Sequence, residues 1–309
     1  MENKRGFEFS FAWLFAIIAG AFIIFLAIYS TMKIIGTEKY QLDTMTAKQL
    51  SIIFEPFETD LASGKASLAA LNEETRIYSS CFSDGSFGKQ KISLSTKSSI
   101  GKKWSEPGGE ISITNKYIFS NATEQGRQVY FFSKPFEMPW KISEIIFLTA
   151  GKYCFANTPE EIADEISGLN IKSIVLENCS NEIKVCFNSR NCKINVVGEC
   201  LNCENKYEYG YIEKEGKKLY FSGSLIYGAV FSSPEIYECN VKRLMKRLFQ
   251  ESAILEDETN FLAGKCGSRS FAVLANLARN LKNSQDLILI NKEAKNLDGQ
   301  NEASKCKLW

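Results

Sequence analysis

Histidine is absent from the 309 residues of this chain. It is the side chain that most often acts as general base near neutral pH, and it is the commonest metal ligand in proteins. Its absence excludes a Ser-His-Asp triad, a Cys-His pair and any metal centre that needs an imidazole.

A net charge is also nearly absent, because 37 Lys and Arg residues face 36 Asp and Glu residues. No field of the whole protein would attract nucleic acid or an anionic surface, so no nucleic-acid partner is expected. Hydrophobic residues make up 45% and charged residues 24% of the chain. These are values of a folded globular protein rather than of a disordered or polytopic one.

One long run lacks charge altogether, from Phe9 to Tyr29. As a helix it matches the ~30 Å hydrocarbon core of a bilayer, so we predict a transmembrane helix over residues 9–31 with the lipid bilayer as its partner. Trp13 and Tyr29 lie near the ends of the run, as interfacial aromatic residues often do. A cleavable signal peptide has a shorter apolar region and a small-residue cleavage site, neither of which is evident.

Charges on the two sides of the run set the expected orientation. Lys4 and Arg5 precede it, and Lys33 and Lys39 follow it. This near parity is resolved by the short basic N-terminus, which favours residues 1–8 in the cytosol, and by the cysteines of the exported part. We expect a single-pass protein of the cell membrane whose C-terminal domain is extracytoplasmic.

The residues Lys4-Arg5-Gly6 before the apolar run resemble the class III signal of archaeal prepilins. The resemblance implies cleavage after Gly6 and assembly into filaments through the apolar helix. Such a signal usually has glutamate fifth after the cut, where this chain has Phe11, and the nearby acid is Glu8. The simpler interpretation is a charged anchor before a signal-anchor helix. The chain as a whole resembles the N-terminally anchored surface proteins of archaea.

The rest of the chain divides into three parts. Residues 37–72 are predicted as an amphipathic stalk helix, because Thr46, Leu50, Ile53, Phe57 and Leu61 recur at helical spacing. Residues 73–231 alternate in short runs separated by turn residues, which predicts a β-rich domain with mixed or antiparallel sheet. Residues 232–309 are predicted as a helical array packed on that domain. The expected fold class is α+β.

A βαβ unit is predicted at residues 145–176. Its strands are Ile145–Leu148 and Ile171–Leu176, and its helix opens at Thr158-Pro159, with Thr158 as the cap and Gly168 as the end. The intervening loop Thr149–Asn157 lies where α/β proteins often bind ligands. It contains a single glycine and no phosphate-binding motif, so no cofactor is expected.

Ten cysteines are the most specific feature of the exported part. In an oxidising compartment they are disulfide candidates, namely Cys81, Cys154, Cys179, Cys186, Cys192, Cys200, Cys203, Cys239, Cys266 and Cys306. Cys154 and Cys179 follow the two predicted parallel strands and form a reasonable pair. An alternative places zinc on Cys186, Cys192, Cys200 and Cys203, although the first spacing exceeds that of a zinc ribbon. A redox-active Cys200-x-x-Cys203 is a third option.

Three classes of function follow. The first is a membrane-anchored, disulfide-stabilised structural or interaction protein without an identifiable catalytic site, acting on an unknown partner or by self-association. Its variant is a pilin-like filament subunit. The second is a membrane-tethered enzyme of the cell envelope using carboxylates such as Glu160 or Asp164, and the third is a cytosol-facing zinc protein. A basic cluster in the last third is interpreted as a solvated helix face, comprising Lys242, Arg243, Lys246 and Arg247.

Overall fold

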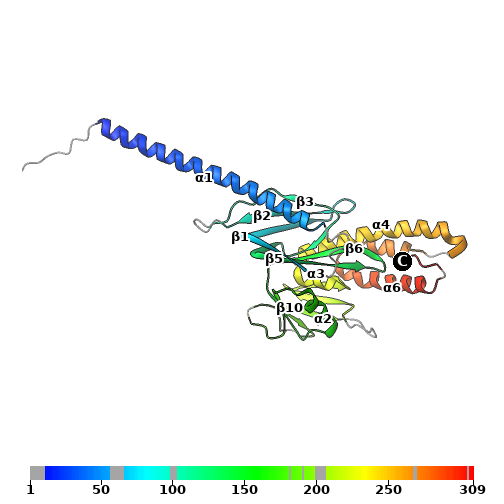
Figure 1. Ribbon diagram of the computed structural model, residues 1–309. Helices are drawn as coiled ribbons and strands as arrows, with labels where there is room; N and C mark the ends of the chain where they lie inside the picture. Colours follow the sequence, from blue (N-terminus) through cyan, green and yellow to red (C-terminus); the bar gives the residue numbers. More distant parts are fainter. Residues whose placement is uncertain are drawn as a thin grey trace, which may run out of the picture.

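The computed structural model describes residues 11–55, 66–97, 103–180, 182–189, 191–198, 207–266, 270–304 and 306–309, except for the side chains of residues 262–266. Within these residues the fold is α+β, as predicted, with a long N-terminal helix, two mixed sheets and C-terminal helices. The motif Lys4-Arg5-Gly6, Glu8, Phe57 and Leu61 lie outside the described residues. Figure 1 shows the long helix extending away from the rest of the chain.

The long helix α1 spans Phe11–Ile53 without a break. Its apolar run and the residues after it contain no proline before Pro56, and a proline disfavours helix for the residue before it. The predicted stalk helix over residues 37–72 is wrong for residues 66–72, and residues 56–65 lie outside the described residues. Residues 66–72 belong to a strand that pairs with another strand of the sheet, and this pairing overrides their Ala- and Leu-rich composition.

Six strands form sheet 1, in which all neighbouring pairs are antiparallel except the last, β6 with β4, which is parallel. In spatial order the strands are β3 (Ile111–Ile113), β2 (Lys89–Thr96), β1 (Ala66–Phe82), β5 (Thr123–Glu137), β6 (Lys141–Thr149) and β4 (Tyr117–Phe119). One face of sheet 1 is covered by the C-terminal part of α1. Its other face turns towards the second sheet.

Sheet 2 has parallel strands at one side and an antiparallel hairpin at the other. Its order is β12 (Lys217–Ser222), β11 (Tyr209–Lys214), β10 (Ile194–Gly198), β9 (Ile183–Phe187), β7 (Tyr153–Ala156) and β8 (Ile174–Leu176). The remaining helices are α2 (Glu160–Leu169), α3 (Leu225–Phe231), α4 (Pro234–Cys266), α5 (Ala272–Arg279) and α6 (Leu287–Glu302), with a short 3₁₀ turn η2 (Ser284–Asp286).

The βαβ unit is β7–α2–β8, and its first strand is not the predicted Ile145–Leu148. Those residues lie in β6, a central strand of sheet 1 that is buried on both faces and therefore reads as a continuous apolar run. The predicted loop after it contains β7. Helix α2 has no side-chain cap, and it ends at Asn170 in the left-handed conformation rather than at Gly168.

Two apolar clusters form the core. The smaller lies between α1 and sheet 1, where Ala47 and Leu50 of α1, and Phe54 directly after it, pack on residues such as Phe131. Of the positions predicted to form the packing face, Leu50 is buried, whereas Ile53 is 41% exposed. The buried residues of α1 in this region are Asp43, Ala47 and Leu50, and the buried Phe54 continues that face beyond the helix end.

The larger cluster joins the two sheets through α3, in which all seven residues are buried. Phe231 touches Phe132 and Phe147 of sheet 1, at ring-centroid distances of 5.8 and 6.5 Å. It also touches Tyr153 and Phe155 of sheet 2, at 4.8 and 6.3 Å. A Cβ atom on Gly228 would lie 2.7 Å from the Phe119 ring, so glycine allows α3 to approach sheet 1 closely.

Replacing Phe54 by alanine tests the contact between α1 and sheet 1. The Phe54 ring is fully buried and lies 5.8 Å from the ring of Phe131. We expect F54A to lower the free energy of unfolding by about 3–5 kcal/mol, the usual cost of such a cavity. The neighbouring I53A, at a half-exposed side chain, is the matched control. Equal effects of the two substitutions in denaturant titrations would contradict this packing.

Candidate functional site

The free half of α1 is the most unusual surface of the described chain. Large apolar side chains surround it, for example Phe15 (65% exposed), Ile18 (59%) and Phe22 (60%). The helix is long and apolar enough to cross a membrane, with a mean hydropathy of 2.7 in its best window and none of that window buried against the rest of the chain. A core helix of a soluble protein would bury this surface, whereas a membrane anchor or a signal helix would not.

A polar clamp fixes the other half of α1 to sheet 1. The carboxylate of Asp43, fully buried, accepts a hydrogen bond from Ser105 Oγ at 2.7 Å and another from the amide of Thr96 at 3.3 Å. The hydroxyl of Thr44 accepts one from the amide of Gly109 at 2.7 Å. A Cβ on Gly108 would lie 2.7 Å from the Thr44 nitrogen, so the loop approaches α1 too closely for a side chain there. Sequence patterns missed this clamp, because a lone Asp43 on an otherwise apolar face gives no distinctive signal.

Three disulfides are complete within the described residues: Cys81–Cys239, Cys154–Cys179 and Cys186–Cys192. The first joins β1 to α4 across 158 residues of chain, and the second joins β7 to the segment after β8. Cys306 is disulfide-bonded as well. Cys200, Cys203 and the side chain of Cys266 lie outside the described residues.

The disulfide between Cys186 and Cys192 bears on the zinc alternative. Two sulfurs bonded to each other supply no thiolate to a metal, so these two of the four candidate ligands are engaged. In the part of the chain that the structure describes, no three His, Cys, Asp or Glu side chains form a group that could hold a metal ion.

The basic cluster on α4 is not a solvated face. Arg243 is fully buried, and its guanidinium donates to the carbonyls of Phe87 and Lys116 and to the side chains of Gln90 and Asn240, at 2.8–3.0 Å. It also lies 4.8 Å from the centre of the Tyr117 ring. Burial lowers the pKa of Arg243 to about 10.

Two neighbouring basic residues of α4, Lys246 and Arg247, also have polar partners. The Lys246 ammonium donates to the carbonyls of Ser83 and Gly85, and Arg247 pairs with Glu251 at 2.8 Å. Together with the Cys81–Cys239 disulfide, the bonds of Arg243 and Lys246 fasten the β1–β2 hairpin to α4, whereas the Arg247–Glu251 pair lies within α4. The helical period suggested one polar side, but it could not show that carbonyls of a distant hairpin would face it.

The two carboxylates proposed for an enzyme, Glu160 and Asp164, have different surroundings. Glu160 is exposed in the first turn of α2, where a negative charge suits the helix dipole. Asp164 lines a cavity of about 290 Å³ together with Lys134, Glu165 and Tyr227. In that cavity Glu165 already accepts from the Tyr227 hydroxyl and pairs with Lys134. The arrangement is explained by packing of α2 against β5 and α3.

A second polar cluster lies where the two sheets meet. The Glu124 carboxylate accepts from the Asn121 side chain at 2.7 Å and from the Ala150 amide at 2.8 Å, and burial raises its pKa. The Lys214 ammonium donates to the carbonyls of Val230 and Ser232, at 2.9 and 2.7 Å, and so caps the C-terminal end of α3. Burial lowers the pKa of Lys214 to about 8, with Glu215 and Glu124 acting against that shift.

Tyr153 and Lys214 line a cavity of about 410 Å³ beside this cluster. Burial raises the pKa of Tyr153 to about 12, so it stays a phenol at neutral pH. Perturbed groups of this kind occur both in active sites and in structural networks. Here Glu124 is bonded to Asn121 and to the Ala150 amide, and Lys214 is bonded to two backbone carbonyls, so these groups connect the two sheets. We therefore interpret the cluster as structural.

No protein-family model, curated protein or solved structure matches this chain. The functional argument therefore depends on the geometry of the chain itself. That geometry contains an exposed apolar helix, long enough to cross a membrane, clamped to a disulfide-bonded α+β domain.

The buried amine of Lys214 predicts a pH dependence of stability. Between pH 8 and about 10.5 the unfolded chain binds a proton that the folded chain has lost, so folding becomes more favourable as pH rises. We expect the free energy of unfolding of the wild type, relative to K214M, to increase by about 1 kcal/mol per pH unit from pH 8 to 9.5, because the folded amine is already half deprotonated at pH 8. K184M, at an exposed lysine, should show no such trend. Parallel pH profiles of wild type and K214M would contradict the burial of this charge.

Proposed function

We propose that this protein is a single-pass membrane protein whose α1 crosses the bilayer and holds an extracytoplasmic, disulfide-stabilised domain for a structural or interaction role. The observation that carries the proposal is α1 itself. It is a continuous helix of 43 residues whose first half is exposed and apolar and whose second half is packed on a sheet. In the proposal, the first half of the helix lies in the bilayer and the second half is part of the folded domain.

The length of α1 supports this division. A bilayer core needs about 20 helical residues, which Phe11 to Thr31 provide. The clamp at Asp43 begins roughly 18 Å further along the helix axis, at a rise of about 1.5 Å per residue. The domain would then lie beside the membrane rather than on a long flexible tether.

The disulfides support the extracytoplasmic side. Structural disulfides persist in oxidising compartments and are rare in the cytosol. Cys81–Cys239 closes a loop of 158 residues, and Cys154–Cys179 joins β7 to the segment that follows its parallel neighbour β8. In the proposal, the domains correspond to a cytosolic N-terminus, the span at residues 9–31 and the exported remainder up to Trp309.

Two paired substitutions on the same helix test the anchoring. Ile18 and Phe22 are 59% and 60% exposed and lie in the proposed span, whereas Leu42 and Met45 are 60% and 63% exposed and lie beyond it. An aspartate near the centre of a span costs about 2.5–3.5 kcal/mol each. We expect I18D/F22D to be released from membranes by alkaline carbonate, while L42D/M45D stays with the membrane fraction.

Comparing the two double variants distinguishes loss of membrane insertion from a general effect of placing charges on α1. Both double variants introduce the same two charges on exposed positions of α1, so the folded domain should tolerate either. Release of the wild type by carbonate, or equal release of both variants, would contradict the proposal.

A filament subunit is a second candidate. Its supporting observation is the apolar exposure of α1 beyond the proposed span, at Leu42, Met45 and Ile52 (60%, 63% and 51%). In this version a peptidase cuts after Gly6, and copies assemble through α1.

The intact mass of protein purified from membranes tests the filament version. A mass that corresponds to a chain starting at Phe7 is the result it predicts. A chain that retains the residues before Phe7 would contradict it and leave the anchored, unprocessed protein as the conclusion.

A further inference from the structure

The end of the domain nearest the free half of α1 carries a cluster of cations around one aromatic ring. Arg76 lies over the Trp104 ring, with its Cζ 4.0 Å from the ring centre, and Lys97 lies 5.5 Å from the same centre. Lys103 precedes Trp104 in the chain and is exposed, as is Arg127 on β5. We call Arg76, Lys97, Lys103, Trp104 and Arg127 the proximal surface.

A short network holds the proximal surface in place. Glu74 pairs with Lys97 at 2.9 Å and accepts from the Gln125 side-chain amide at 2.6 Å, and the side-chain oxygen of Gln125 accepts from Arg76 Nε at 2.9 Å. These contacts, with Arg127 nearby, lower the pKa of Glu74. The proximal surface thus carries four cations against Glu74 and Glu106, two residues after Trp104, so its net charge stays positive.

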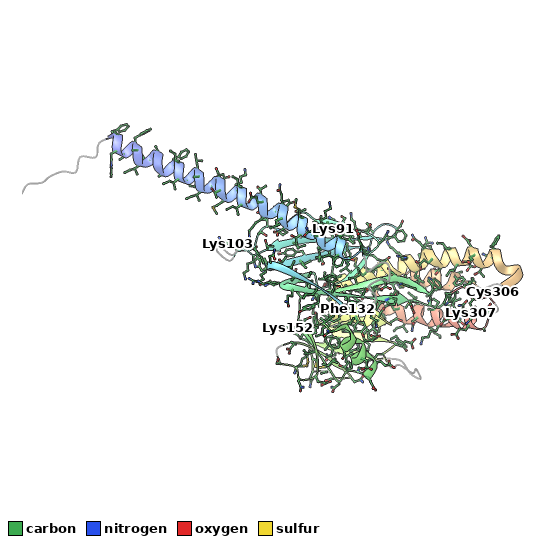
Figure 2. The ribbon with its side chains drawn as sticks, in the orientation of Figure 1. Lys91, Lys103, Phe132, Lys152, Cys306 and Lys307 are labelled. Atoms are coloured by element: carbon green, nitrogen blue, oxygen red, sulfur yellow. A yellow bond between two sulfur atoms is a disulfide. The ribbon has the colours of Figure 1, made fainter. Side chains whose placement is uncertain are left out.

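The polar clamp fixes where this surface lies along α1. Ser105, next to Trp104, donates to Asp43, and Lys39, one helical turn closer to the span, pairs with Glu73 at 3.5 Å. Figure 2 shows Lys103 at the end of the domain that faces the free half of α1, whereas Cys306 and Lys307 lie at the opposite end.

The helix rise converts this position into a distance from the bilayer. Ser105, next to Trp104, is bonded to Asp43, which lies roughly 18 Å beyond Thr31 along the axis. The headgroup layer occupies about 5–8 Å of that length, which leaves a gap of about 10–13 Å. A lysine or arginine side chain spans roughly half of this gap, and the rest is shorter than the Debye length of about 8 Å at physiological salt. The cations of the proximal surface therefore lie within the electrostatic range of the headgroups.

We propose that the proximal surface binds the anionic headgroups of the leaflet from which α1 emerges. The inference rests on the proposed anchoring through α1. Each lysine or arginine near an anionic leaflet adds a favourable, salt-sensitive interaction, and a tryptophan between cations suits the headgroup level. The domain would then contact the membrane at two places. Helix α1 holds it at the bilayer, and the proximal surface fixes its tilt relative to the membrane plane.

The test uses the full chain reconstituted into vesicles of phosphatidylcholine, with or without phosphatidylglycerol. A membrane-impermeant amine reagent labels exposed lysines, and mass spectrometry gives the ratio of the rates at Lys103 and Lys307. The ratio cancels the fraction of protein enclosed in vesicles. We expect phosphatidylglycerol to lower the ratio about five-fold and high salt to restore it.

A charge reversal on the same surface sharpens the test. R127E should weaken the protection of Lys103 by phosphatidylglycerol, whereas K184E, on strand β9 of sheet 2, should leave it unchanged. Both positions are exposed, so folding should not differ between the variants.

Flotation of the vesicles after alkaline carbonate treatment separates the two proposals. Protein that does not float overturns the anchoring and this inference together. Protein that floats, but with the same ratio of Lys103 to Lys307 labelling in both lipid compositions, overturns the headgroup contact alone.

Discussion

The contact between Asp43, Ser105 and the residues around them is the constraint on which the rest of the structure depends. On one side of it, α1 exposes apolar side chains that water does not favour; on the other, Ala47, Leu50 and Phe54 are buried against sheet 1. Because the helix has no break between these halves, the clamp transmits the position of the free half to the whole domain. A flexible linker at this point would leave the domain free to rotate, and the proximal surface would have no fixed orientation.

Three kinds of interaction connect sheet 1 to the rest of the domain: aromatic packing, buried polar groups and a disulfide. Phe231 of α3 touches aromatic rings of both sheets, while Lys214 and Glu124 satisfy backbone groups where the sheets meet. The β1–β2 hairpin is fastened to α4 by a disulfide and by hydrogen bonds from Arg243 and Lys246. A buried cation with carbonyl partners is costly to place, and the adjacent disulfide keeps its partners in position.

Several features could be predicted from the sequence because their signals are local. The apolar run from Phe9 predicts a long membrane-spanning helix, and the structure has a long helix whose apolar half is exposed. Residues 232–309 are predicted as helical, and the structure places α4, α5 and α6 there. Other features depend on distant partners. Ile145–Leu148 reads as the first strand of a βαβ unit, yet sheet 1 recruits it, and Arg243 reads as solvated, yet a hairpin more than 150 residues away buries it.

Disulfide mapping of protein extracted from the membrane fraction without reduction tests the central claim most directly. The account predicts peptides linked through Cys81–Cys239, Cys154–Cys179 and Cys186–Cys192, since the fold brings these pairs together and the proposed compartment oxidises them. Free thiols at these positions in membrane-bound protein would contradict an extracytoplasmic domain. The same links found only in protein outside the membrane fraction would contradict the role of α1 as an anchor.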